Sequence, residues 1–143
     1  MKKAKNMSDY TLTVTSVKLC NVVKQGDYYF NTSSWTPGTA TANYTIFSGS
    51  ATLGDTDYTA MDTSGSPYLI LIPQTLTAWN PTETPSNTYL ELTCTIKNGS
   101  TGVYTGTAYI PFAATLEKGT QYDVRINIGK NSLYSAANTK AIK

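Results

Sequence analysis

Alternation of apolar and polar residues, with a period of two, runs through most of this chain and limits it to β-structure. The clearest example is residues 89–97, where the apolar positions are Leu90, Leu92, Cys94 and Ile96. Thr and the eleven Tyr residues favour pleated, half-buried surfaces. The sequence therefore predicts an all-β protein, an antiparallel β-sandwich of about seven strands with Greek-key or transthyretin-like topology.

The same pattern, together with the turn residues, places the individual strands. We expect them at residues 10–23, 28–30, 43–47, 67–72, 89–97, 103–112 and 122–128. In the first strand the parity of the apolar positions shifts near Ser16, which predicts a β-bulge there. Asn98-Gly99 is a typical two-residue turn and predicts a hairpin between its flanking strands.

The 143 residues suit one domain with one core. We expect the sandwich to span residues 10–129. Residues 1–9 are expected to be a disordered or residual N-terminal segment. Residues 130–143, which are polar and small with few large apolar groups, are expected to be a C-terminal tail.

The composition excludes several kinds of function. The chain has no His, which removes Ser-His-Asp and Cys-His catalysis and His-based zinc sites. Its net charge of +2 gives no basic surface for nucleic acid. No stretch approaches the ~20 apolar residues of a membrane-spanning helix. We expect no enzymatic activity, no cofactor, no metal, no nucleic-acid partner and no direct membrane insertion.

Two acidic groups leave weaker alternatives. Asp55, Asp57 and Asp62 share one loop and have the oxygen ligands that Ca²⁺ uses, without the spacing of a known calcium loop. Glycosidases use a pair of carboxylates, which Glu83, Glu91 and Glu117 could supply in principle. Their spacing in the sequence does not select any two of them as a catalytic pair. Solvated surface acids are the simpler interpretation of both groups.

The cysteines and tryptophans each allow two interpretations. Cys94 lies on an inward face and suits a small core residue, and the alternative in an exported protein is a disulfide with Cys20. Trp35 and Trp79 lie in or beside loops. They either cap the ends of the core or stack on sugar rings as parts of a carbohydrate-binding or host-adhesion module.

Three phrases of the chain resemble the fimbrillin family of Bacteroidota. They are an apolar strand ending in Ile72-Pro73-Gln74, the turn Gly119-Thr120-Gln121-Tyr122 leading into a strand, and the segment from Val14 to Val22, which is similar to a Ser-Val-x-Leu-x-Asn strand. The resemblance covers residues from about 10 to 128, and it departs from the family at the N-terminus. The usual lipoprotein signal and first strand are expected to be missing before Ala4.

The resemblance implies a structural subunit of a bacterial fimbria or pilus, located at the cell surface, outer membrane or fimbrium. Its partners would be other copies of itself or related pilin subunits, and a microbial or host surface glycan or protein is a further option. A sandwich that lacks one strand exposes a groove that a strand from the next subunit can fill. The candidate donor strand is the tail, with Leu133, Tyr134, Ser135, Ala137 and Ile142 as its contact residues.

Overall fold

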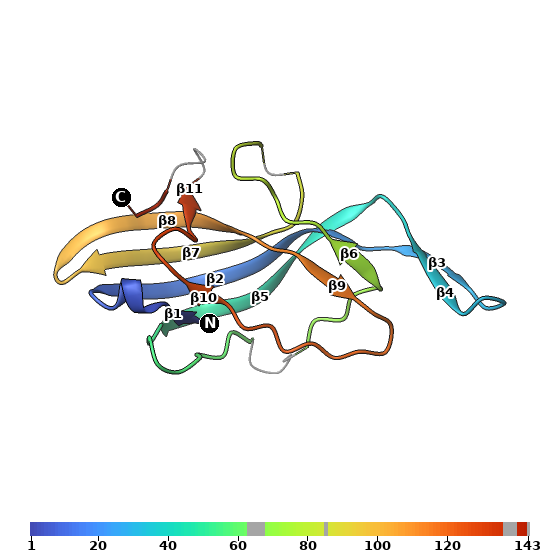
Figure 1. The fold of residues 1–143 in the computed structure, drawn as a ribbon, viewed down its shortest axis with the longest axis horizontal. Coiled ribbons are helices and arrows are strands. Elements are labelled where there is room, and N and C mark those ends of the chain that lie inside the picture. The colour runs from blue at the N-terminus through green and yellow to red at the C-terminus, as the bar shows by residue number, and fades with distance from the viewer. Residues whose placement is uncertain (63–67, 85, 136–139, 143) are drawn as a thin grey trace.

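The framework of the protein is a five-stranded antiparallel sheet with the strand order β11-β8-β7-β2-β5 (Figure 1). The computed structural model describes residues 1–62, 68–84, 86–135 and 140–142. The strands of the sheet are β2 (Tyr10–Val23), β5 (Thr41–Thr52), β7 (Tyr89–Asn98), β8 (Thr101–Pro111) and β11 (Tyr134–Ser135). The prediction of an all-β fold is confirmed, and the hairpin at Asn98-Gly99 joins β7 to β8.

Three small sheets complete the fold. β1 (Lys2–Lys3) pairs in parallel with β10 (Asn127–Ile128), and β6 (Gln74–Leu76) pairs with β9 (Ala114–Leu116). These two sheets pack on the large sheet as a second layer, consistent with a β-sandwich. The third sheet is the hairpin of β3 (Gly26–Tyr29) and β4 (Ser34–Pro37), which projects from the end of the molecule (Figure 1).

A bulge in β2 keeps its apolar side chains on a single face of the sheet. Val14 lies opposite Cys94 and Ser16 lies opposite Thr93, so Thr15 has no partner in this register. The extra residue offsets the parity shift in the sequence, so the apolar residues on both sides of it are buried in one core. The predicted bulge is confirmed. The core side chains of β2 and β7 are Leu12, Val14, Val17, Leu19, Val22, Leu90, Leu92, Cys94 and Ile96.

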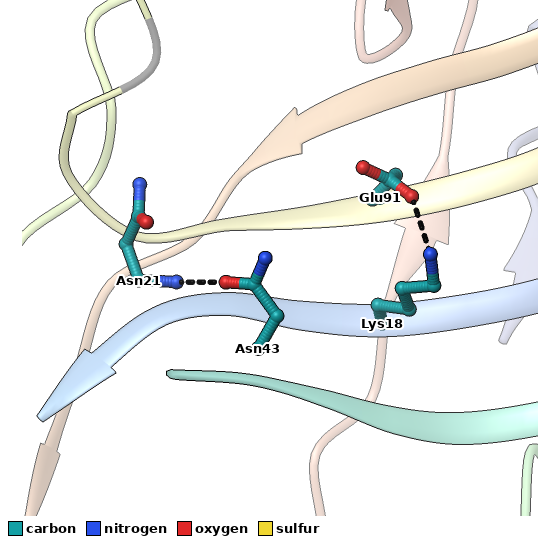
Figure 2. Close-up of polar contacts among 4 residues, drawn as sticks. All are labelled: Lys18, Asn21, Asn43 and Glu91. Atoms are coloured by element: carbon teal, nitrogen blue, oxygen red, sulfur yellow. Dashed lines mark hydrogen bonds and ion pairs between the residues drawn. The ribbon is translucent and has the colours of Figure 1, made fainter. Parts of the chain in front are cut away.

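A second irregularity in β2 lies at Asn21, whose φ of 61° is in the left-handed region. Its backbone N–H donates to Oδ1 of Asn43 at 3.0 Å (Figure 2). Its own side-chain amide donates to the carbonyl of Asn87 at 3.0 Å. Asn tolerates this conformation better than other side chains. Figure 2 also shows the partly buried ion pair of Lys18 with Glu91 at 3.1 Å on the neighbouring strand.

The N-terminal segment, residues 1–9, was expected to be disordered or residual, and it contributes Met1 and Met7 to the core. Residues 5–7 form the short 3-10 helix η1 (Lys5–Met7), and Met7 is fully buried. The amide of Ala4 donates to the carbonyl of Ile128 at 2.8 Å. Met1, Met7 and Ile128 from this region pack in the main core against the large sheet.

Two of the predicted strands are wrong. Residues 68–72 lie outside any strand, and so do residues 122–126, leaving only the short β10 of the last predicted strand; Pro67 lies outside the described residues. Both segments have the apolar composition of strands. A strand also needs a hydrogen-bonded neighbour, and sequence pattern alone does not supply one.

Candidate functional site: an apolar groove beside the sheet

A groove of about 1210 Å³ lies between the inner face of the large sheet and three covering segments. The segments are residues 58–62, 68–73 and 116–126. The floor comes from inward-facing positions of β2, β5 and β7, namely Val17, Leu19, Tyr44, Ile46 and Leu90. Leu76 of β6 and Leu116 of β9 also line it, so the groove lies between the large sheet and the side of the second layer that contains β6 and β9.

The rim of the groove consists of apolar side chains that remain exposed. Ile70 is 90% exposed and Val124 is 52% exposed, and both line the groove. Tyr68, Leu69 and Tyr122 are also exposed at this rim. Contiguous exposed apolar surface marks interaction sites on soluble proteins. All five rim residues come from the two segments that were wrongly predicted to be strands.

Charges along the groove balance each other. Its lining contains the basic residues Lys24, Lys118 and Arg125 and the acidic residues Asp62, Glu117 and Asp123. Arg125 pairs with Asp123 at 3.2 Å, and its guanidinium lies 5.7 Å from the ring centroid of Tyr58. An apolar floor with equal numbers of acidic and basic side chains suits an extended polypeptide segment better than a small anion or cation.

Gln74, from the phrase Ile72-Pro73-Gln74, connects the segment before it to the end of β2, near the β3–β4 hairpin. Its side chain is buried and bonds to the backbone of Val23, which itself lines the groove. Nothing in the sequence distinguished this glutamine from a solvated turn residue, because its partner lies fifty-one positions away.

The two tryptophans lie in different environments. Trp79 is 1% exposed, and the rings of Tyr89, Tyr109 and Tyr134 surround it with centroids at 5.8 to 5.9 Å. Its Nε1 donates to the carbonyl of Glu83 at 2.9 Å. The indole thus has no face available to a sugar. Trp35, on β4, is 36% exposed and lines the groove, so sugar stacking stays a prediction for Trp35 alone.

The C-terminal tail is folded against its own sheet. β11 pairs with β8, placing Tyr134 opposite Tyr109 and Ser135 opposite Ala108. Leu133 is fully buried and Ile142 is 5% exposed, and both belong to the main core. Ala137, the remaining predicted contact residue, lies outside the described residues. The role of this tail as a donor strand therefore stays a prediction, and it requires the tail to leave this position.

The cysteines are free and buried. Cys20 lies opposite Tyr89 on β7, whereas Cys94 of β7 lies opposite Val14. Five positions along β7, from Tyr89 to Cys94, therefore separate the two cysteines, about 17 Å, which is too far for a disulfide. Burial raises the pKa of Cys94 to about 11, and burial together with the nearby Glu91 carboxylate raises that of Cys20. Both thiols are thus poor nucleophiles at neutral pH.

The acidic residues form no metal centre in the part of the chain that the structure describes. Within residues 1–62, 68–84, 86–135 and 140–142, no group of three or more Cys, Asp or Glu side chains is placed to hold an ion. The loop aspartates Asp55, Asp57 and Asp62 are included in that search.

The model of one protein family, described as fimbrillin-like, matches residues 1–140. The chain belongs to the fimbrillin-like family. No curated protein and no solved structure matches this fimbrillin-like chain significantly. Among its described residues, no helix is both long and apolar enough to cross a membrane. Membership of the family suggests a structural subunit of fimbriae, located at the cell surface.

Proposed function

We propose that this fimbrillin-like chain is a non-enzymatic fimbrial subunit that assembles by β-strand addition, with its groove accepting a strand from another copy. The observation that carries the proposal is the pair of strand-like segments without strand partners. Residues 68–72 and 122–126 have the composition of strands, line one groove and leave their apolar side chains exposed.

An added strand would satisfy both requirements of such segments. Its backbone would supply the hydrogen-bonding neighbour that the two segments lack in any strand pairing of the described residues. Its alternate side chains would bury against floor residues such as Leu19 and Leu90, while rim residues such as Ile70 would lose their exposure to water. A contact between a groove and a strand is heterologous and generates open filaments rather than closed dimers.

The donor that we propose is the C-terminal tail of a neighbouring copy. Before donation, this tail must separate from β8 and withdraw Leu133 and Ile142 from the core. That requirement makes spontaneous assembly slow, and it makes deletion of the tail a poor test because the shortened chain would lose core packing.

Point variants at the rim test the proposal without disturbing the core. Ile70→Asp and Val124→Asp place a charge at exposed positions of the groove. Val103→Asp is the matched control, because Val103 is 37% exposed on β8 and does not line the groove. Full-length chains would be compared by light scattering over a concentration series and by binding of a labelled peptide of residues 130–143.

We expect the unmodified chain and Val103→Asp to form oligomers and to bind the peptide, whereas both rim variants lose these properties and unfold at an unchanged urea concentration. If the unmodified chain is strictly monomeric and does not bind the peptide, strand addition is ruled out. Equal binding by all four proteins would rule out this groove as the acceptor.

A further inference from the structure

One side of the β3–β4 hairpin is an aromatic face formed by Tyr28, Phe30 and Trp35, and strand addition in the groove does not by itself involve it. Tyr28 lies opposite Trp35 in the hairpin register, with ring centroids 5.3 Å apart. The ring of Phe30 packs edge-on against Tyr28 at 5.0 Å, and Phe30 is 87% exposed. Tyr29, which pairs with Ser34, points to the opposite face of the hairpin.

This aromatic face continues the groove. Trp35 lines the groove together with Val23 and Lys24, at the end of β2 where the hairpin begins. The ammonium of Lys118, on the groove rim, donates to the carbonyl of Ser33 in the hairpin turn at 2.5 Å. A two-stranded hairpin is marginally stable alone in water, and this bond holds it in line with the groove.

At the β1–β10 end, the lining of the groove borders paired backbone. There β1 pairs with β10, and the amide of Lys2 donates to the carbonyl of Ile126, which is itself a lining residue. We therefore expect an inserted strand that is longer than the groove to extend past the hairpin.

The donor segment exceeds the length of the groove floor. The floor follows β2 from Val17 to Val23, six residue steps or about 20 Å. An extended segment of residues 133–143 spans ten residue steps, about 33 Å. The difference, about 13 Å, is enough to cross the aromatic face, whose neighbouring ring centroids lie 5.0 and 5.3 Å apart.

From these relations we infer that the face formed by Tyr28, Phe30 and Trp35 is an extension of the strand-accepting groove, and that it binds the part of a second copy's C-terminal segment that emerges from the groove. The inference rests on the proposed function. The inclination of the rings supports a polypeptide rather than a sugar as the ligand. Tyr28 makes interplanar angles of 87° with Phe30 and 52° with Trp35, so the three rings share no flat platform for a pyranose.

The test uses full-length variants and a fluorescein-labelled peptide of residues 130–143, with binding measured by fluorescence anisotropy. Trp35→Ala and Phe30→Ala alter the aromatic face. Tyr29→Ala is the matched control, since it removes an exposed aromatic ring from the other face of the same hairpin. We expect a rise of about tenfold in the Kd for Trp35→Ala and a smaller rise for Phe30→Ala. Tyr29→Ala should stay within about twofold of the unmodified chain.

Each alternative result has a definite meaning. If the unmodified chain binds the peptide and all three variants bind it equally well, the extension onto the hairpin is wrong while strand addition stands. Equal weakening by Trp35→Ala and Tyr29→Ala would show a general effect on the hairpin and would also overturn the inference. Absence of both peptide binding and self-association in the unmodified chain would overturn the inference together with the proposed function. Retention of an oligosaccharide on a glycan array that Trp35→Ala abolishes, with peptide binding unchanged, would assign the face to carbohydrate instead.

Discussion

The side chain of Gln74 acts as a substitute strand partner for the backbone of Val23. Its Oε1 accepts the amide hydrogen of Val23 at 2.9 Å, and its Nε2 donates to the carbonyl of Val23 at 2.9 Å. Nε2 also donates to the carbonyl of Ile72 at 3.2 Å. A single carboxamide thus satisfies the last backbone groups of β2 and fixes the preceding apolar segment beside the sheet, which gives the glutamine of the phrase Ile72-Pro73-Gln74 a physical role.

Replacing this carboxamide should destabilise the protein. Gln74→Leu retains most of the volume but leaves the backbone groups of Val23 without their partner, so we expect a loss of about 1–3 kcal/mol in the free energy of unfolding. Thr75→Ala, on the exposed side of β6, is the control and should change it by less than about 0.5 kcal/mol. Urea unfolding measures both. Equal stability of Gln74→Leu and the unmodified chain would show that water replaces the side chain.

The left-handed backbone at Asn21 makes a prediction about residue type. Both Asn21→Gly and Asn21→Ala remove the side-chain bond to Asn87, but only Ala adds the steric cost of a positive φ. We therefore expect Asn21→Ala to be less stable than Asn21→Gly by about 1 kcal/mol, as measured by thermal or urea unfolding. The reverse order of stability would mean that the backbone at residue 21 relaxes to an ordinary strand conformation in the variants.

The different environments of the tryptophans should be visible in both stability and fluorescence. Trp79→Ala removes a buried indole from a cluster of three Tyr rings and should cost about 3–5 kcal/mol. Trp35→Ala, at an exposed hairpin position, should cost less than about 1 kcal/mol. Trp35→Phe leaves Trp79 as the single emitter, and its spectrum should be blue-shifted until the chain unfolds. Emission at the wavelength of a solvated indole in the folded state would contradict the buried placement.

Burial of Cys94 predicts a loss of stability in alkali. The thiol is neutral when protonated, and burial raises its pKa from 9.0 to about 11. The unfolded chain therefore releases this proton at lower pH than the folded chain, so the stabilising contribution is complete below pH 9 and is lost as the pH rises towards 11. Two pKa units correspond to an upper limit of about 2.7 kcal/mol.

The contribution of Cys94 is separated by comparing urea midpoints of the unmodified chain and Cys94→Ala from pH 8 to 11. The variant should start less stable, because it loses core packing, but its stability should fall less steeply with pH. Tyr89, whose pKa burial raises to about 12, stays in both proteins and contributes the same slope to each. Parallel curves would show that the Cys94 thiol does not titrate differently in the two states.

How much of the fold the sequence predicted depended on where each strand finds its partners. β2 has the bounds expected for the first strand, and β7 and β8 agree closely with their predictions, because period-two alternation and the Asn98-Gly99 turn are local signals. β4 is absent from the strands expected from the sequence, since Ser34–Pro37 shows no alternation and its pairing depends on β3. Residues 68–72 and 122–126 show the opposite error, because their composition favours strands while the fold gives them no strand partner.

The sequence by itself determined the all-β class, the main strands, the bulge near Ser16 and the family, because each of these is encoded in residues that are close together or in a fixed order. Only the tertiary structure decided that Trp79 is buried while Trp35 lines a groove, that Cys20 and Cys94 are too far apart to bond, and that Gln74 pairs with Val23. These relations depend on the strand register and on how the second layer packs on the large sheet. Both are set by contacts between residues tens of positions apart, which local pattern does not specify.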